Sequence, residues 1–324
     1  MEVKILKTFE ITDDLWEKIA AGFRESFATD TTAERLKNAF CVHNKLGYGY
    51  HAVAISEEGE VAGYNVFSPT FYESGINVVV SGSTYVRPKF RSTNEFLFMD
   101  MMKALRKAVI KDGYQIEVGV PNHNSRDFAA KILRLKYIGD LDYYILPYKV
   151  SKCLNKPSLS FLDSIFTGML RSHLWLQSVC AAMFNGKEKE VKYRLLTKDE
   201  DLRARFKGTY AHICKGNMEA YYRLVDEDGK KAAYLMDFRE NGMRTAKSIN
   251  FAVRTIVKKE HPDAVLFVGL LRLKQYSLFK VPKSFVPKPL PLTYYVLDKA
   301  NKERYADMDD ISNWNFSLIN FDVR

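Results

Sequence analysis

Two stretches of this sequence recur about 150 residues apart, and this repetition limits the folds open to the chain. Gln115–Gly119 (QIEVG) is matched by Ala264–Gly269 (AVLFVG), and Tyr143–Leu146 (YYIL) by Tyr294–Leu297 (YYVL). The offsets stay between about 148 and 151 residues, as expected of a duplicated module. A chain of 324 residues is also long enough for two domains, each with its own core. We therefore predict two related lobes, with chance similarity between two α/β lobes as the alternative.

Hydrophobic periodicity and turn residues predict alternating strands and helices in the first half. The expected strands cover Val3–Phe9, Tyr50–Ser56, Val61–Pro69, Ile76–Val86, Gln115–Val120 and Asp142–Lys149. The expected helices run from about Asp13 to Ala28, and over Thr32–Phe40, Asn94–Lys111 and Ser125–Leu135. A hairpin over 221–238 and a helical face at Ala246, Ile249, Val253 and Val257 repeat the later part of this plan. The order predicts a mixed α/β sheet fold, duplicated.

The segment between the repeats, Phe161–Phe184, is strongly apolar and has helical spacing. Asp163, Arg171 and His173 interrupt it, and the longest uncharged stretch is too short to span a bilayer. We expect a helix clamped between two lobes, with an interfacial membrane helix as the alternative. This assigns residues 1–150 to an N-terminal domain, 151–190 to a helical linker, and 191–324 to a C-terminal domain.

Charge and cysteine content restrict the partners and the compartment. The net charge of +10 favours coenzyme phosphates, nucleic acid or a membrane surface, although many basic surfaces are only solvated. The apolar fraction of 47% excludes general disorder. The N-terminus has no apolar leader, and the four cysteines show no metal-ligand or disulfide spacing. We expect a cytoplasmic protein with no metal and no transmembrane segment.

A basic turn, Val86–Asn94 (VRPKFRSTN), lies between an expected strand and a long expected helix. Successive backbone N–H groups and a helix N-terminus can receive a pyrophosphate, and Arg91 adds a positive charge. A capped helix start is the simpler explanation. The turn resembles the acyl-CoA signature of the GNAT (GCN5-related N-acetyltransferase) superfamily, in which V-x-P-x-[YF]-R leads into a glycine-rich turn. Ser92 and Asn94 replace the glycines that are usual there.

The order of elements around the turn strengthens this resemblance. GNAT proteins part their fourth and fifth strands at a position like Ser81–Ser83, and the pantetheine arm of the coenzyme fits between them. The segment Val120–Ser125 is similar to the family's strand-five end, where an asparagine often contacts the coenzyme. The resemblance therefore implies acetyl-CoA or another acyl-CoA as co-substrate. The implied contacts are Tyr85, Val86, Arg91, Ser92, Thr93, Asn94, Glu95, Phe96, Asn122 and Asn124.

Acyl transfer from a thioester to an amine requires a group that accepts the proton of the amine. Glu73, His123 and, through ordered water, Ser81 or Ser83 are the candidates. His123 is preferred because it follows strand five and titrates near neutrality. An exposed loop histidine without a catalytic role is the alternative explanation.

The departing thiolate also gains a proton in this reaction. Many GNAT enzymes supply it from a tyrosine on the helix after strand five. Ile132 occupies that place here, so the resemblance leaves the role to Tyr137 or Tyr143, or leaves it vacant.

The resemblance thus implies a tandem GNAT enzyme that transfers an acetyl or longer acyl group from CoA to an amine of a small molecule or sugar. The N-terminal lobe would be active, and the C-terminal lobe degenerate, because Phe238–Arg244 keeps little of the phosphate turn. One alternative is a peptidyltransferase-like enzyme that takes aminoacyl groups from tRNA, which the positive charge would suit. Another is a non-catalytic binding protein on the same fold, suggested by Ser92, Asn94 and Ile132.

Overall fold

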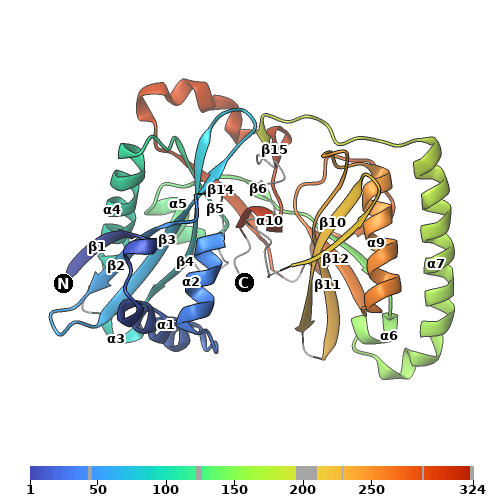
Figure 1. Ribbon diagram of the computed structural model, residues 1–324, viewed down its shortest axis with the longest axis horizontal. Helices are drawn as coiled ribbons and strands as arrows, with labels where there is room; N and C mark the ends of the chain where they lie inside the picture. Colours follow the sequence, from blue (N-terminus) through green and yellow to red (C-terminus); the bar gives the residue numbers. More distant parts are fainter. Residues whose placement is uncertain are drawn as a thin grey trace.

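The computed structural model has two lobes that lie side by side, each built on its own β-sheet with helices packed on it (Figure 1). Residues 1–42, 46–92, 94–121, 126–194, 210–227, 229–286 and 288–321 are described.

The N-terminal lobe is built on a seven-stranded sheet. In spatial order its strands are β1 (Glu2–Lys7), β2 (Tyr50–Ile55), β3 (Val61–Phe71), β4 (Asn77–Val86), β5 (Ile116–Gly119), β14 (Pro291–Val296) and β6 (Lys136–Asp140). Neighbouring strands are antiparallel except β4 and β5, which are parallel. This one parallel pair is the feature on which the candidate site depends.

The C-terminal lobe is built on a six-stranded sheet. In spatial order its strands are β13 (Phe279–Lys280), β7 (Tyr143–Pro147), β12 (Ala264–Val268), β11 (Lys230–Glu240), β10 (Met218–Glu227) and β9 (Ala211–Lys215). Here β11 and β12 form the parallel pair. Two short strands, β8 (Tyr193–Arg194) and β15 (Trp314–Asn315), pair with each other between the lobes (Figure 1).

The two sheets exchange one strand. Strand β7 pairs with β12, while its sequence counterpart β14 pairs with β5. The strand expected at Asp142–Lys149 is present as β7, but it belongs to the second sheet. Strand β14 thus pairs with the outer edge of β5, and β7 pairs with the outer edge of β12. Without these partners, both edges would be exposed. The division into units 1–150 and 191–324 stays a prediction, and both sheets contain strands from each side of it.

Helices cover both faces of the N-terminal sheet. Thr12 caps α1 (Asp13–Phe27), which packs with α2 (Ala33–Val42) on one face. On the other face lie α4 (Leu97–Lys111) and α5 (Arg126–Lys131), and α3 (Pro88–Arg91) is a single turn before α4. The expected helices and the strand at 76–86 are thus present with small shifts at their ends.

In the C-terminal lobe, α9 (Ala246–Glu260) packs on the sheet, and α7 (Ser160–Met183) packs on α9. The short helix α6 (Val150–Cys153) precedes α7 in the sequence. Another short helix, α10 (Leu318–Phe321), is the last element of the described chain. The 3₁₀ helices cover Thr8–Glu10, Pro157–Leu159, Lys283–Phe285, Lys299–Asp309 and Ile311–Asn313.

A single apolar cluster joins the lobes. It contains Val118 and Tyr294 of the first sheet, Met236 of the second, and the fully buried Trp314 between them. Trp314 packs on Tyr193, with ring centroids 4.7 Å apart. Because this cluster is continuous, the two lobes share a core instead of meeting across a solvated surface.

Helix α7 does not lie between the lobes. It runs along the outer edge of the C-terminal lobe (Figure 1) and buries only Leu174 and Ala181 completely. The expected clamp is therefore wrong, because the shared core already joins the lobes elsewhere. Among the described residues, no helix is long and apolar enough to cross a membrane.

Candidate functional site

The parallel strands β4 and β5 part in the middle of the N-terminal sheet. Their pairing ends at Ser81 and Gly119, whereas β4 continues to pair with β3 as far as Val86. The edge of β4 over residues 82–86 therefore has no strand partner on the β5 side within the described chain. Backbone N–H and C=O groups along such an edge can bind an extended ligand as a strand would.

An irregularity in β4 accompanies the parting. The register with β3 shifts between Tyr64 and Val66, and Ser83 opposite the shift has a left-handed φ of 52°. A Cβ added to Gly82 would have no atom within 4 Å, so there is space beside the strand at this point. The expectation that Ser81–Ser83 marks a parting of the strands is confirmed.

Among the described residues, the turn after β4 carries one positive charge without an acidic partner. Arg87 is paired with Glu25, and Lys89 with Glu60. Arg91 donates from Nε to the carbonyl oxygen of Val86 at 2.8 Å, and in the described part of the chain it forms no ion pair. The remaining N–H groups of its guanidinium are thus available to an anion.

The residues predicted to bind the coenzyme differ in which of their groups a ligand could contact. The side chain of Tyr85 is buried against α1, where its hydroxyl donates to the carbonyl of Ile19, so only its backbone lies along the edge. Burial raises the pKa of this hydroxyl. The backbone N–H of Asn94 donates to Phe90 and is already used.

The last part of the turn leads into α4. Ser92, Glu95 and Phe96 are exposed, and Phe96 is the residue that precedes the helix. The negative charge of Asp100, in the first turn of α4, opposes anion binding at this helix end. The amino group of Lys103 lies 3.8 Å from the Asp100 carboxylate and counters this charge. Thr93, Asn122 and Asn124 lie outside the described residues.

Of the predicted catalytic residues, His123 lies outside the described residues and Glu73 lies at the far end of β4. Glu73 is at the tip of the β3–β4 hairpin, where its carboxylate is 3.6 Å from the guanidinium of Arg194. From the start of β4 to Ser81 the chain rises about 13 Å. The structure thus does not bring Glu73 to the parting of the strands.

Tyr137 lies on β6, in the same row of the sheet as the parting. It pairs with Thr293, which pairs with Gly119, which in turn pairs with Ser81. Three spacings of about 4.8 Å separate the backbones of Tyr137 and Ser81 by about 14 Å. The described residues therefore do not place Tyr137 in contact with the open edge.

The C-terminal lobe parts its parallel strands in the same way. The pairing of β11 with β12 ends at Tyr234 and Leu266, although β11 runs on to Glu240. Here the C-terminal segment of the chain occupies the opening. Gly269, just after β12, bridges to Ser317, and the N–H of Leu270 donates to the carbonyl of Phe316 at 2.6 Å.

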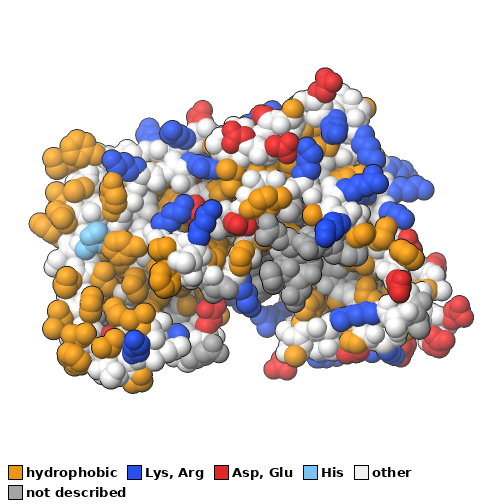
Figure 2. Space-filling view, turned by 180° about the vertical axis from the view of Figure 1, so that it is seen from behind, with side chains coloured by type: hydrophobic (Ala, Val, Ile, Leu, Met, Phe, Trp, Pro, Cys, Tyr) orange, Lys and Arg blue, Asp and Glu red, His pale blue; other side chains and the backbone are white. Residues whose placement is uncertain are grey.

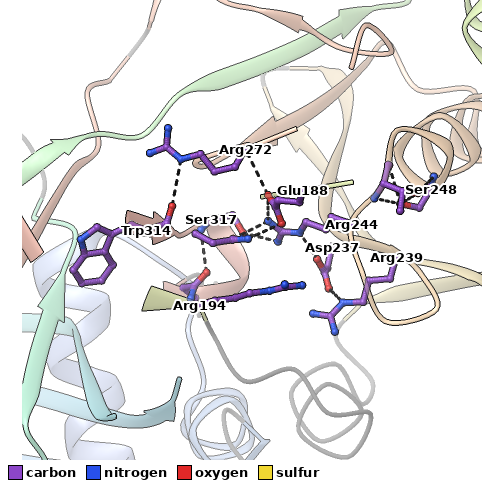
Figure 3. Close-up of polar contacts among 12 residues, drawn as sticks. Glu188, Arg194, Asp237, Arg239, Arg244, Ser248, Arg272, Trp314 and Ser317 are labelled. Atoms are coloured by element: carbon purple, nitrogen blue, oxygen red, sulfur yellow. Dashed lines mark hydrogen bonds and ion pairs between the residues drawn. The ribbon is translucent and has the colours of Figure 1, made fainter. Parts of the chain in front are cut away.

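A buried ionic network completes this filling (Figure 3). Asp237 of β11 is bound by Arg239 at 2.5 Å and by Arg244 at 2.8 Å. Arg244 also donates to Asn315 and Ser317 of the C-terminal segment. Burial alone would raise the pKa of Asp237, but the two arginines outweigh it and hold the pKa below its usual value. Sequence analysis did not predict this network.

Solved structures with this arrangement of strands and helices match almost the whole chain. A probable N-acyltransferase from Enterococcus faecalis V583 superposes with a TM-score of 0.51 at 9% identity, over 92% of this chain and 73% of that one. GCN5-related N-acetyltransferases from Kribbella flavida and Anabaena variabilis ATCC 29413 each give 0.53 at 10% identity, over 92% of this chain and 71% and 73% of theirs. No protein-family model matches the sequence, and no curated protein is similar to it.

These similarities show the fold. The chain has the GNAT fold, and the likeness extends over both lobes, as expected of a tandem arrangement. The predicted mixed α/β class and the resemblance are thereby confirmed.

Proposed function

We propose that the chain is an acyl-CoA-dependent N-acyltransferase whose donor site is the open edge of β4 in the N-terminal lobe. The observation that carries this proposal is the parting of β4 from β5 after Ser81 and Gly119. Among the described residues, this leaves the β5 side of residues 82–86 without a strand partner, next to the turn before α4. The GNAT fold of the similar structures supports the same class of reaction. Fold alone does not set function, so the proposal depends on this edge.

The pantetheine arm of acetyl-CoA or another acyl-CoA fits the edge by its chemistry. Its two amides can exchange hydrogen bonds with the backbone of residues 82–86, much as an added strand would. The free space beside Gly82 leaves room for the arm. Arg91 and the N-terminal end of α4 would then bind the pyrophosphate.

The chemistry that this arrangement suits is direct transfer. The nitrogen of a neutral amine attacks the thioester carbonyl carbon, the carbon–sulfur bond breaks, and the acyl group is joined to nitrogen. A backbone N–H near Ser83 would polarise the carbonyl oxygen, an effect worth about 10²–10³ in rate. We propose His123 as the base that takes the amine proton, while the coenzyme thiolate leaves and gains a proton. The acceptor would be an amine of a small molecule or sugar.

The C-terminal lobe would serve as a support. Its equivalent opening is occupied by residues 314–321 and by the network around Asp237. We therefore expect one coenzyme per chain, although two GNAT-like lobes are present.

Titration calorimetry with acetyl-CoA tests the proposal. The parent should bind with a stoichiometry of about one, and Arg91→Ala should weaken binding by about ten- to a hundredfold, because a charge-assisted contact is lost. Lys247→Ala is the control, because Lys247 is a basic residue in the first turn of α9, the helix that follows β11 in the C-terminal lobe. It should leave the affinity unchanged.

Three results would overturn the proposal. The absence of binding at millimolar acetyl-CoA would remove the donor site and favour a binding protein without catalysis. Parental affinity in Arg91→Ala would show that the turn is wrongly assigned. A loss of affinity in Lys247→Ala would move the site to the other lobe.

A further inference from the structure

The outer face of α7 is almost entirely apolar. Arg171 is the only exposed charged residue between 160 and 184, and the carboxylate of Asp163 is bound by Ser151. Hydrophobic side chains gather over this edge of the molecule (left in Figure 2). The exposed large apolar residues here are Phe161, Ile165, Met169, Trp175, Leu176, Val179, Met183 and Phe184.

The fold does not need this face. The inner side of α7 is already packed on α9 through Leu174 and Ala181, and the side chain of Asn250 donates to the carbonyl of Leu174. Soluble monomers rarely expose contiguous apolar surface of this extent, because water contact with it is unfavourable. The face therefore has the properties of a binding surface.

A basic and aromatic segment lies against the same helix. Residues 271–286 contain four lysines and arginines and no aspartate or glutamate. His173 connects α7 to this segment. Its Nε2 lies 2.7 Å from the carbonyl oxygen of Tyr276, and its ring packs on that of Phe279. Tyr276, Phe279 and Phe285 are exposed, as are Lys274, Lys280 and Lys283.

We propose that α7 and residues 271–286 together bind the surface of an anionic lipid bilayer. The 24 residues of α7 form a rod of about 36 Å that would lie in the plane of the membrane, with its apolar face among the upper acyl chains. Lys274 and Lys283 would lie near the anionic headgroups, each contributing about fivefold in affinity.

Charge favours this occupant over a second copy of the chain. Each chain carries a net charge of +10, and a symmetric pair would bring two such basic segments toward each other. An anionic bilayer matches both the apolar face and the positive charge beside it.

The tryptophans provide a direct measurement. Trp16 and Trp314 are buried at 1% and 0% exposure, whereas Trp175 on the outer face of α7 is 61% exposed. Vesicles of phosphatidylcholine with about a third phosphatidylglycerol should shift the tryptophan fluorescence emission to shorter wavelength, because Trp175 would leave water. Brominated acyl chains in these vesicles should quench that fluorescence. Pure phosphatidylcholine vesicles should bind more weakly, and added salt should weaken binding to the anionic ones. Trp175→Phe should still sediment with vesicles but lose the spectral change.

Two variants test the two parts of the surface. Leu176→Gln should weaken vesicle binding by about tenfold, because an apolar side chain is lost from the acyl region. Ile110→Gln is the matched control, since Ile110 is 47% exposed on α4 and Leu176 is 51% exposed. Lys274→Gln with Lys283→Gln should weaken binding to anionic vesicles by about twentyfold and reduce its dependence on salt.

The proposal is overturned if millimolar anionic lipid leaves the tryptophan emission unchanged, or if neutral and anionic vesicles bind equally. It is also overturned if sedimentation shows a dimer that Leu176→Gln dissociates while vesicles do not bind. Acetyl-CoA titration is independent of these measurements, so failure of the membrane site and failure of the proposed transferase can be distinguished.

Discussion

Ser81 and Gly119 are the last residues that β4 and β5 pair with each other, and the N-terminal sheet opens beyond them. Tyr234 and Leu266 hold the same position in the C-terminal sheet. The two openings differ in what lies beyond them, because the chain's own residues 314–321 fill the second one. One duplicated feature can thus serve as a ligand site in one lobe and as a packing site in the other.

The space beside Gly82 leads to a prediction about the first opening. Gly82→Val should leave the melting temperature nearly unchanged, because its Cβ meets no atom within 4 Å and valine suits a strand. The added side chain should weaken acetyl-CoA binding by about tenfold or more in calorimetry, since it would occupy room that the pantetheine arm needs. Unchanged affinity together with an unchanged melting temperature would show that the coenzyme does not use this opening.

Much of the fold could be predicted because local patterns determine it. The strand at 77–86, its irregularity near Ser83 and the long helix after it follow from spacing and turn residues. The strand exchange could not be predicted. YYIL and YYVL have the same apolar pattern, so either strand could cover β5 or β12, and only the path of the whole chain decides between them.

The parts of the site that sequence analysis missed depend on distant residues. Asp237, Arg244 and Asn315 meet in space, yet no periodic pattern links their positions. The only local signal was the charged residue Asp237 directly after the apolar run Ala232–Met236. The position of α7 was missed for a related reason, because helical spacing of apolar residues does not say what covers them.

The exchange of β7 and β14 predicts that the halves depend on each other. A fragment of residues 1–150 would leave β5 without β14 and expose β7, so it should be insoluble or lack cooperative unfolding. Fragments 1–190 and 191–324 produced together should copurify, because each supplies the strand that the other lacks. A soluble 1–150 fragment with a cooperative melting transition would contradict this dependence.

The buried His51 should make the free energy of unfolding depend on pH. Its ring is buried between the Thr8 hydroxyl and the Tyr64 hydroxyl, and burial lowers its pKa to about 3. In the unfolded chain its pKa is about 6.5, so between these values only the unfolded state binds the proton. The free energy of unfolding should therefore fall as pH drops below about 6.5, by about 2 kcal/mol at pH 5. Urea titrations of the parent and of His51→Gln should show this slope only in the parent.

Neutralising Asp237 should lower the free energy of unfolding substantially. Asp237→Asn would leave Arg239 and Arg244 buried without their shared carboxylate and should cost about 3–5 kcal/mol in urea denaturation. Asp14→Asn is the control, since its pair with Lys18 is exposed and should contribute under about 0.5 kcal/mol. Because the folded pKa of Asp237 is lowered, its contribution should be complete above about pH 4 and be lost only in stronger acid. A parental unfolding midpoint in Asp237→Asn would contradict the role of this network.

The proposed base leads to the last prediction. His123 follows Gly119, the last residue of β5, by four positions in the sequence. If it accepts the amine proton, His123→Ala should lower kcat by about 10²–10⁴ while acetyl-CoA binding stays near parental. Glu73→Gln should change kcat little, because Glu73 lies at the far hairpin tip beside Arg194. Tyr137→Phe should also have a small effect, since its backbone lies about 14 Å from that of Ser81. A parental kcat in His123→Ala would instead favour proton transfer through water held by Ser81 or Ser83.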